Sequence, residues 1–483
     1  MRQDVDIRQR EGELTGLAEA ILRQAKRLGA AAAEVSVSED IGLTVKVRKG
    51  ELETLEFNAD RSFGIAVYDG QRKGSASTSD SSEGAIEETV ARALGIARHT
   101  QDDPCHGLAD ADLMAAHLPD LDLFHPAPLD TEAALAAALA CEAEGFATDQ
   151  RIVNSEGAEA ARSQSCVVYG NSHGFMGAAS TTSHSLSCVL IAQDGNGMQR
   201  DYWYTAHRNP QSLEAPEAVG RTAAERTAAR LSPRKVATGS YPVLFSPQAA
   251  RSLAGHVIGA LSGGAQYRKA SFLLDALDAE VASPHLHLVE QPRLPGRLGS
   301  ASFDGDGVAT AEKAFIDAGA VRNYVLSAYS GRRLGLPTTG NAGGVHNLLL
   351  KGRTKAFKAL LNDMDRGLYV TDLMGTGVNG VTGDYSQGAA GFWVEGGEFA
   401  YPVHEITIAS NLKDMLRQVA AVGDDPDQRG NIITPSVLIE TMTGAGGGAL
   451  FSSDSWRGWV CGRGVRCAER CSSMRWMPSG QGR

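Results

Sequence analysis

Residues 365–405 read DRGLYVTDLMGTGVNGVTGDYSQGAAGFWVEGGEFAYPVHE, and this is the most informative stretch of the chain. An apolar run of β type leads into a glycine-dense turn and then a polar loop. An aromatic hairpin follows, with Gly396-Gly397 at its tip, because glycine takes the positive φ angles that tight hairpin turns require. The stretch therefore predicts paired strands rather than a helix.

The residues around this stretch extend the same pattern. From VLFSP at 243–247 to about residue 443, β-type segments alternate with Gly-rich turns. We expect long helices here only at 247–261 and 410–421. A domain dominated by strands buries one face of its sheet against another layer or closes the sheet on itself. The C-terminal half is therefore predicted to be a β-rich domain, barrel-like or a sandwich.

The N-terminal half shows both helical and β spacing. Apolar residues recur at helical spacing over 13–28 and 82–99. Between these helices, alternating apolar pairs predict four strands: Val35 and Val37, Val45 and Val47, Leu55 and Phe57, and Ile65 and Val67. Short turns such as Lys49-Gly50 and Asp69-Gly70 join them. Further helices are predicted after Asp130, a plausible N-cap, and at 216–231.

A short internal sequence repeat relates two parts of this half. SFGIAVYDGQRKGSAST at 62–78 resembles SQSCVVYGNSHGFMGAAST at 163–181, and both read as hairpins that follow a helix. We therefore expect an α+β fold with a duplicated helix-plus-antiparallel-hairpin N-terminal half. The expected divisions are an N-terminal α+β domain (1–110), a central α+β domain (120–231), the β-rich C-terminal domain (236–443) and an atypical, disordered tail (444–483).

Composition excludes several classes of function. The net charge of −11 and estimated pI of 5.6 disfavour nucleic-acid binding, because phosphate backbones repel an acidic protein. We expect no membrane span, because no apolar run approaches the ~18 residues that one needs. The first residues, MRQDVDIRQREGELTG, lack the apolar segment of a secretory signal. With seven scattered Cys and no C-x-x-C pair, a reducing cytoplasm is the expected compartment.

Three short motifs match catalytic or binding patterns, but their contexts argue against them. Residues 170–174 match G-x-S-x-G, yet a returning strand follows, so we expect a hairpin turn. Residues 375–380 match G-x-G-x-x-G without the helix that a dinucleotide site needs. Asp304-Gly305-Asp306-Gly307 is too short for a calcium loop and reads as a turn.

Zinc proteolysis needs two imidazoles on one helical face and a carboxylate that activates water. No His-Glu pair in this chain is followed within about one helical turn by a second His. His404-Glu405 lies in a β-type segment, with Ala409 where the second His would stand. His285 and His287 fall two apart in a predicted strand, so they would face the same side and could share a metal.

Several blocks in order carry a family resemblance: VYGNSHG (168–174), TTSHSLSC (181–188), RDYWYT (200–205), SGRRLGLPTTGNAGG (330–344) and the 368–405 block. Over roughly 10–443 the chain resembles the PmbA (TldE) branch of the TldD/PmbA metallopeptidase family, also called modulators of DNA gyrase. In TldD-type members, zinc is bound by His-Glu-x-x-x-His on the first helix of the C-terminal domain and by a distant Cys. The matching helix here, 250–260, keeps only His256, and no Cys lies between Asp424 and Thr443.

The resemblance implies a cytoplasmic partner of a TldD-like subunit that carries the zinc, with no catalytic or metal-binding residue in this chain. Such a chain shapes the cavity and holds unfolded peptides, and it can form a homodimer when alone. Glycines that admit close backbone approach suggest a substrate groove at Gly375, Gly377, Gly380, Asp384, Gly340 and Asn341. Two alternatives stay open: a self-sufficient metallopeptidase using His285, His287 or His404, and a non-proteolytic peptide-binding scaffold.

Overall fold

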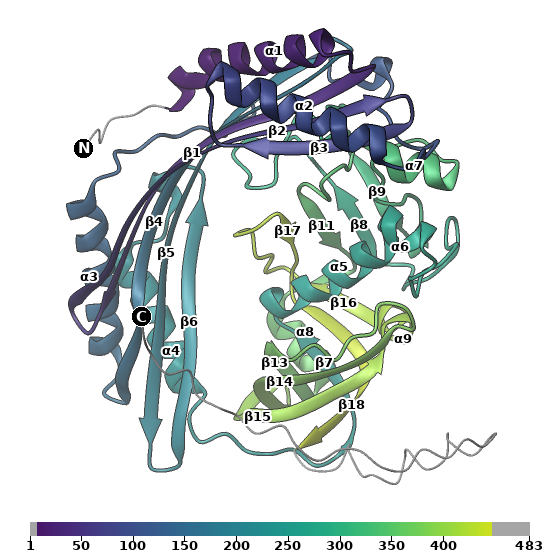
Figure 1. Ribbon diagram of the computed structural model, residues 1–483. Coiled ribbons are helices and arrows are strands. Elements are labelled where there is room, and N and C mark those ends of the chain that lie inside the picture. The colour runs from purple at the N-terminus through teal and green to yellow at the C-terminus, as the bar shows by residue number, and fades with distance from the viewer. Residues whose placement is uncertain (1–6, 447–483) are drawn as a thin grey trace, which may run out of the picture. The chain divides into compact units, whose positions relative to one another are not determined.

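The computed structural model describes residues 7–446 (Figure 1). Most of the predicted tail therefore lies outside the described residues. Residues 444–446 do not belong to a tail: they end a strand, β18 (Val437–Gly446), and that part of the prediction is wrong. Within the described range, no helix is long and apolar enough to cross a membrane.

A six-stranded sheet organises the first half, in the order β3-β2-β1-β4-β5-β6, and all neighbouring strands are antiparallel. Its strands are β1 (Ala32–Arg48), β2 (Glu51–Asp69), β3 (Arg72–Thr78), β4 (Ile152–Asn171), β5 (Met176–Asp194) and β6 (Gly197–His207). The helices are α1 (Glu11–Arg27), α2 (Glu83–His99), α3 (Thr131–Thr148) and α4 (Pro216–Ala229), with 3₁₀ turns η1 (Ile7–Arg10), η2 (Ala111–Leu113) and η3 (Pro210–Ser212). One apolar core joins all four helices to the sheet.

The predicted duplication is confirmed. A helix, three antiparallel strands and a second helix occur in the order α1-β1-β2-β3-α2 and again in the order α3-β4-β5-β6-α4. The two units meet where β1 pairs with β4, so a single sheet runs through both. The hairpin reading of residues 170–174 also holds, because β4 turns directly into β5 there.

The prediction of four strands between residues 35 and 67 is wrong, because β1 and β2 each run through two of them. The buried side chains of Ile41 and Leu43 continue the alternation of β1 where a turn had been expected. Glu39, the acidic residue nearby, is buried but accepts a 2.9 Å hydrogen bond from Arg61 Nε on β2. A charge paired across strands costs the sheet little, so it does not interrupt the strand.

The C-terminal half contains a closed barrel, one of the two architectures that the sequence predicted. Its five strands are β7 (Gly239–Phe245), β13 (Gly367–Met374), β14 (Asp384–Glu395), β15 (Glu398–Asn411) and β18. The ring closes because β18 pairs with both β15 and β7. Strands β16 (Val419–Gly423) and β12 (Thr354–Lys355) extend it beyond β18. A second sheet has the order β10 (Ala320–Val321), β9 (Lys313–Asp317), β8 (His287–Glu290), β11 (Leu348–Lys351) and β17 (Ile432–Ile433).

The helices of this half are α5 (Pro247–Leu261), α6 (Gly263–Tyr267), α7 (Ala328–Leu334), α8 (Phe357–Met364) and α9 (Leu412–Arg417). The predicted helix at 410–421 is thus wrong beyond Arg417. Residues 419–423 instead form β16, which pairs with β18 and buries Val419 and Val422. Tertiary strand pairing has overridden a local helical pattern here.

Candidate functional site

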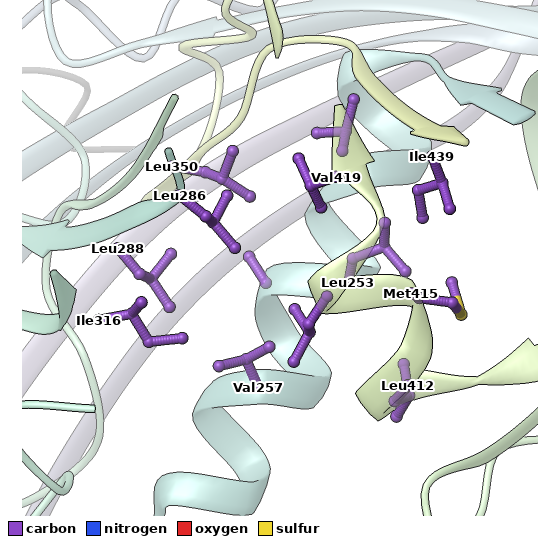
Figure 2. A pocket seen from close by; sticks show the side chains of 13 residues that line it. Leu253, Val257, Leu286, Leu288, Ile316, Leu350, Leu412, Met415, Val419 and Ile439 are labelled. Carbon is purple, nitrogen blue, oxygen red and sulfur yellow. The ribbon is translucent and has the colours of Figure 1, made fainter. Parts of the chain in front are cut away.

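Helix α5 is the element on which the family resemblance places zinc chemistry. It begins with Pro247 at its first turn, and the Ser246 side chain caps it by accepting a hydrogen bond from Ala249 N at 3.3 Å. Leu253 and Val257 point into a cavity of about 30 Å³ lined only by apolar side chains (Figure 2). A cavity this small with no polar partner is a packing void rather than a ligand site. It marks the face by which α5 is held in the core.

His256 lies on the flank of α5 and is half-buried. Its ring stands edge-on to Tyr385 of β14, with ring centroids 6.3 Å apart. Burial lowers the pKa of His256, so the imidazole is neutral at physiological pH. Burial also raises the pKa of Tyr385, whose hydroxyl oxygen has no hydrogen-bond partner among the described residues. The pair therefore offers one neutral imidazole and one neutral phenol.

These residues do not fit a zinc ion. In a His-Glu-x-x-x-His helix that began at His256, the glutamate would stand at Val257 and the second histidine at Leu261. Both are core residues, with exposed fractions of 3% and 0%. Across residues 7–446, no three His, Cys, Asp or Glu side chains gather closely enough to hold a metal. We therefore derive no catalytic step through zinc bound to this chain.

The other candidate histidines are separate from one another. His285 precedes β8 and is exposed, whereas His287 opens the strand and its Nδ1 lies 2.7 Å from Asp317 Oδ1. The prediction that both share one strand face is therefore wrong. His404 and Glu405 form a bulge in β15, where pairing shifts between Ile406 and Val403. A bulge lacks the helical spacing that a second ligand requires.

The loop 375–384, whose last residue begins β14, lies beside the His256–Tyr385 pair, because Val378 bridges to Tyr385. Gly377 approaches the chain's own β14: its carbonyl accepts from Ser386 N at 2.7 Å, and an added Cβ would lie 1.8 Å from Ser386 O. Gly375 and Gly380, by contrast, have open space where a Cβ would stand.

Asp384 begins β14 at the end of this loop. Its carboxylate accepts hydrogen bonds from Thr382 Oγ1 at 2.7 Å and from Asn411 Nδ2 at 3.2 Å. The structure therefore groups four of the predicted groove residues, Gly375, Gly377, Gly380 and Asp384, in one loop next to His256.

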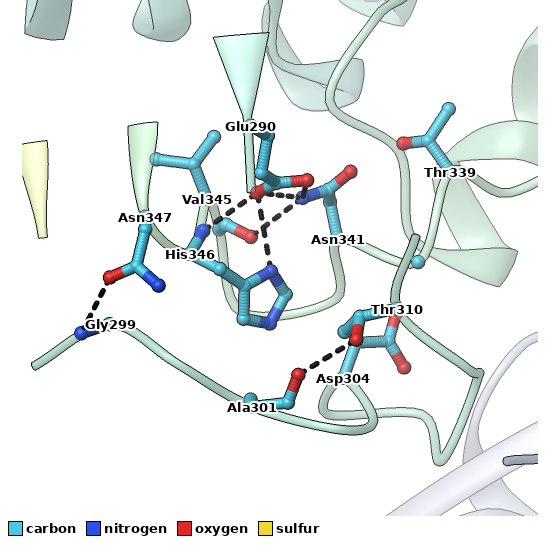
Figure 3. Close-up of polar contacts among 12 residues, drawn as sticks. Glu290, Gly299, Ala301, Asp304, Thr310, Thr339, Asn341, Val345, His346 and Asn347 are labelled. Atoms are coloured by element: carbon cyan, nitrogen blue, oxygen red, sulfur yellow. Dashed lines mark hydrogen bonds and ion pairs between the residues drawn. The ribbon is translucent and has the colours of Figure 1, made fainter. Parts of the chain in front are cut away.

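Of the other two groove candidates, Asn341 belongs to a buried polar network. Asn341 Nδ2 donates to both oxygens of Glu290, at 2.9 and 3.1 Å (Figure 3). Glu290 is fully buried and also accepts from Lys313 Nζ at 2.6 Å and from His346 N at 2.7 Å. Burial raises the pKa of Glu290, but the hydrogen bond from His346 and the charge of Lys313 outweigh it and lower the pKa to about 2. Gly340 has φ of +68° and packs against Ala309.

The sequence reasoning missed two residues, one beside His256 and one in the buried network. Tyr385 follows Asp384 directly, so the alternation of β14 could have indicated that it turns inward. Glu290 carries no such signal, because a lone acidic residue at the end of a short apolar run reads as exposed.

Comparisons with known proteins agree with this architecture. Models of the PmbA/TldA metallopeptidase family match residues 33–97 (domain 1), 124–231 (central domain) and 238–446 (C-terminal domain). The chain belongs to this metallopeptidase family. It is 48% identical over 414 residues to the metalloprotease PmbA of Escherichia coli O157:H7, covering 86% of this chain and 92% of that protein.

Solved structures share the fold. A crystal structure from Bacteroides thetaiotaomicron, described as a candidate modulator of DNA gyrase, is 27% identical with a TM-score of 0.85, covering 90% of this chain and 99% of that one. The TldE structure from Thermococcus kodakarensis is 19% identical with a TM-score of 0.76, covering 89% and 100%. At that identity the likeness to TldE concerns the fold.

Proposed function

We propose that this chain is the zinc-free, TldE-like subunit of a two-chain cytoplasmic metallopeptidase, paired with a TldD-like subunit that carries the zinc. The observation that supports this most is on α5. The two positions that a zinc helix would need after His256 are occupied by Val257 and Leu261, which are built into the core. Replacing either by a polar ligand would place an unsatisfied group in an apolar interior.

In this proposal the chain shapes the cavity and holds an unfolded peptide. The loop 375–384 is the candidate contact, because Gly375 and Gly380 leave their backbone unobstructed. An extended peptide binds by main-chain hydrogen bonds, which are independent of its sequence. The polar Asp384 at the edge of the loop gives such a peptide a hydrogen-bond acceptor.

A reconstitution experiment tests the division of labour. The chain alone, the TldD-like subunit alone and the two together are assayed on an unfolded protein and on short peptides, with zinc measured in each preparation. We expect peptidase activity only in the mixture and no stoichiometric zinc in this chain. One zinc per chain together with activity would support a self-sufficient enzyme. Peptide binding without any association with the TldD-like subunit would support a scaffold.

The substrate loop is tested separately in the reconstituted complex. Gly380→Val adds bulk where the structure leaves open space, so it should raise KM for a peptide while kcat and the zinc content stay unchanged. Gly195→Val, in the β5–β6 turn where space is equally open, is the matched control. Equal kinetics for both variants would remove this loop from the substrate path.

A further inference from the structure

Strand β2 has an outer edge that no other strand covers. On its inner side it pairs with β1 from Glu51 to Tyr68, but on its outer side β3 pairs only with residues 63–69 (Figure 1). Residues 51–62, here called the β2 edge, therefore have no outer neighbour within the part of the chain that the structure describes. A ten-residue stretch of such an edge is about 33 Å long at the usual rise of a strand. Its unpaired backbone groups are a template for another strand.

One face of the β2 edge is apolar and exposed. Leu52, Leu55 and Phe57 stand opposite three core residues of β1: Val47, Val45 and Leu43. A strand's side chains share a face with their direct partners, so these three lie on the helix-covered face. They nevertheless keep exposed fractions of 49%, 50% and 44%. The apolar face of the sheet thus extends beyond the part that the helices cover.

The other face of the same edge is acidic. Glu56 and Asp60 stand opposite Thr44 and Asp40. Glu56, Asp60 and Asp40 form no ion pair with any residue in the described range 7–446. This contrasts with Glu53, whose carboxylate lies 2.6 Å from Lys46 Nζ. The edge therefore carries uncompensated negative charge on one face and unburied apolar area on the other.

A long strand edge with exposed apolar side chains is a hazard for aggregation unless a partner covers it. We propose that the β2 edge docks an edge strand of the zinc-carrying subunit, a strand with apolar side chains on one face and Lys or Arg on the other. The inference rests on the two-chain function proposed above. It gives the complex a sheet that continues from one subunit into the next.

The charge pattern favours a different chain over a second copy of this one. If two β2 edges paired, the acidic faces carrying Glu56, Asp60 and Asp40 would meet each other. Like charges directly opposite on neighbouring strands destabilise the pair. A basic partner strand would gain from the same charges, mainly in association rate and in choice of partner.

The test measures association of the full chain with its TldD-like subunit and, separately, self-association of the chain alone. The variant Leu55→Lys/Phe57→Lys should weaken the heteromeric association by about 100-fold, because it places charges in the apolar centre of the interface. Glu56→Lys/Asp60→Lys should weaken it by about 10-fold at low salt and less at high salt. Circular dichroism confirms folding of each variant. Hydrogen exchange should show that the amides of residues 52–60 that face away from β1 become protected only in the complex.

Met198→Lys is the matched control, since Met198 is 65% exposed on β6 at the opposite edge of the same sheet. It should change the affinity less than about 3-fold. Unchanged affinity in both β2-edge variants, with wild type associating normally, overturns this interface but leaves the proposed function standing. No association of the wild-type chains overturns both. Protection in the chain alone of the amides of 52–60 that face away from β1 would show another occupant and overturn the proposal. A homodimer of the chain alone that is lost in Leu55→Lys/Phe57→Lys would do the same.

Discussion

The C-terminal barrel and the N-terminal sheet differ in whether their strand edges are paired. In the barrel, β18 pairs with β7 and closes the ring, so no strand of that ring lacks a neighbour. In the sheet, β3 covers only residues 63–69 of β2 and leaves the β2 edge open. In the C-terminal half, the buried charge of Glu290 on β8 is satisfied internally, whereas Glu56 on the β2 edge leaves its charge on the surface. Substitutions in the C-terminal half should therefore act on stability, whereas substitutions on the β2 edge should act on the association that we propose.

The largest expected effect separates two glutamates, one from each half. Glu290→Ala leaves Lys313 without its partner in a buried site and should lower the free energy of unfolding by about 3–5 kcal/mol. Glu56→Ala removes an exposed charge and should change it by less than about 0.5 kcal/mol. Urea unfolding at neutral pH measures both. Similar losses of unfolding free energy at Glu290 and Glu56 would contradict this contrast between the two halves.

The pH dependence of stability gives a second test of the buried charge at Glu290. The pKa of Glu290 is about 2 in the folded chain, below its ordinary value of 4.5. A depressed folded pKa means that ionised Glu290 contributes stability that is fully present above about pH 4.5 and is lost as the pH falls towards 2. The difference in free energy of unfolding between wild type and Glu290→Gln should therefore shrink between pH 6 and pH 3. A constant difference over that range would contradict the assignment.

A smaller effect distinguishes glycines in the two halves. An added Cβ at Gly377 meets the backbone oxygen of Ser386 at 1.8 Å, and that backbone belongs to the closed barrel. Gly377→Ala should therefore cost about 1–3 kcal/mol of stability. At Gly42 of β1, an added Cβ meets the side-chain oxygen of Asn58 at 2.5 Å, and Asn58 lies on the open β2 edge where it can move. Gly42→Ala should cost less than about 1 kcal/mol, as thermal unfolding would show.

The smallest expected effect concerns His256 itself. If this chain carries no zinc, His256→Ala should leave the peptidase activity of the reconstituted complex within about 2-fold of wild type. The matched control replaces the first histidine of the zinc helix in the TldD-like subunit, which should abolish activity. A His256→Ala complex that assembles, retains its metal and is inactive would place catalytic chemistry on this chain.

Part of the candidate site could be predicted from sequence and part could not. The loop 375–384 was identifiable because dense glycine is a local signal, and the structure places it beside His256. Its assignment as a substrate groove stays a prediction. Asn341 was grouped with it on the same glycine signal, yet its side chain belongs to the Glu290 network, whose members are far apart in the chain. Contacts of that kind depend on how distant strands pair, which no local pattern encodes.

Features that local chemistry controls follow directly from the amino-acid sequence. Lys49-Gly50 and Asp69-Gly70 turn where expected, and Asp130 caps α3 by accepting from Glu132 N at 2.9 Å. These depend on φ angles and hydrogen bonds within a few residues. Other features depend on long-range packing: the unbroken length of β1, the end of α9 at Arg417 and the closure of β18 on β7. Each of these is set by burial against partners distant in sequence, and that burial is large enough to override local propensity.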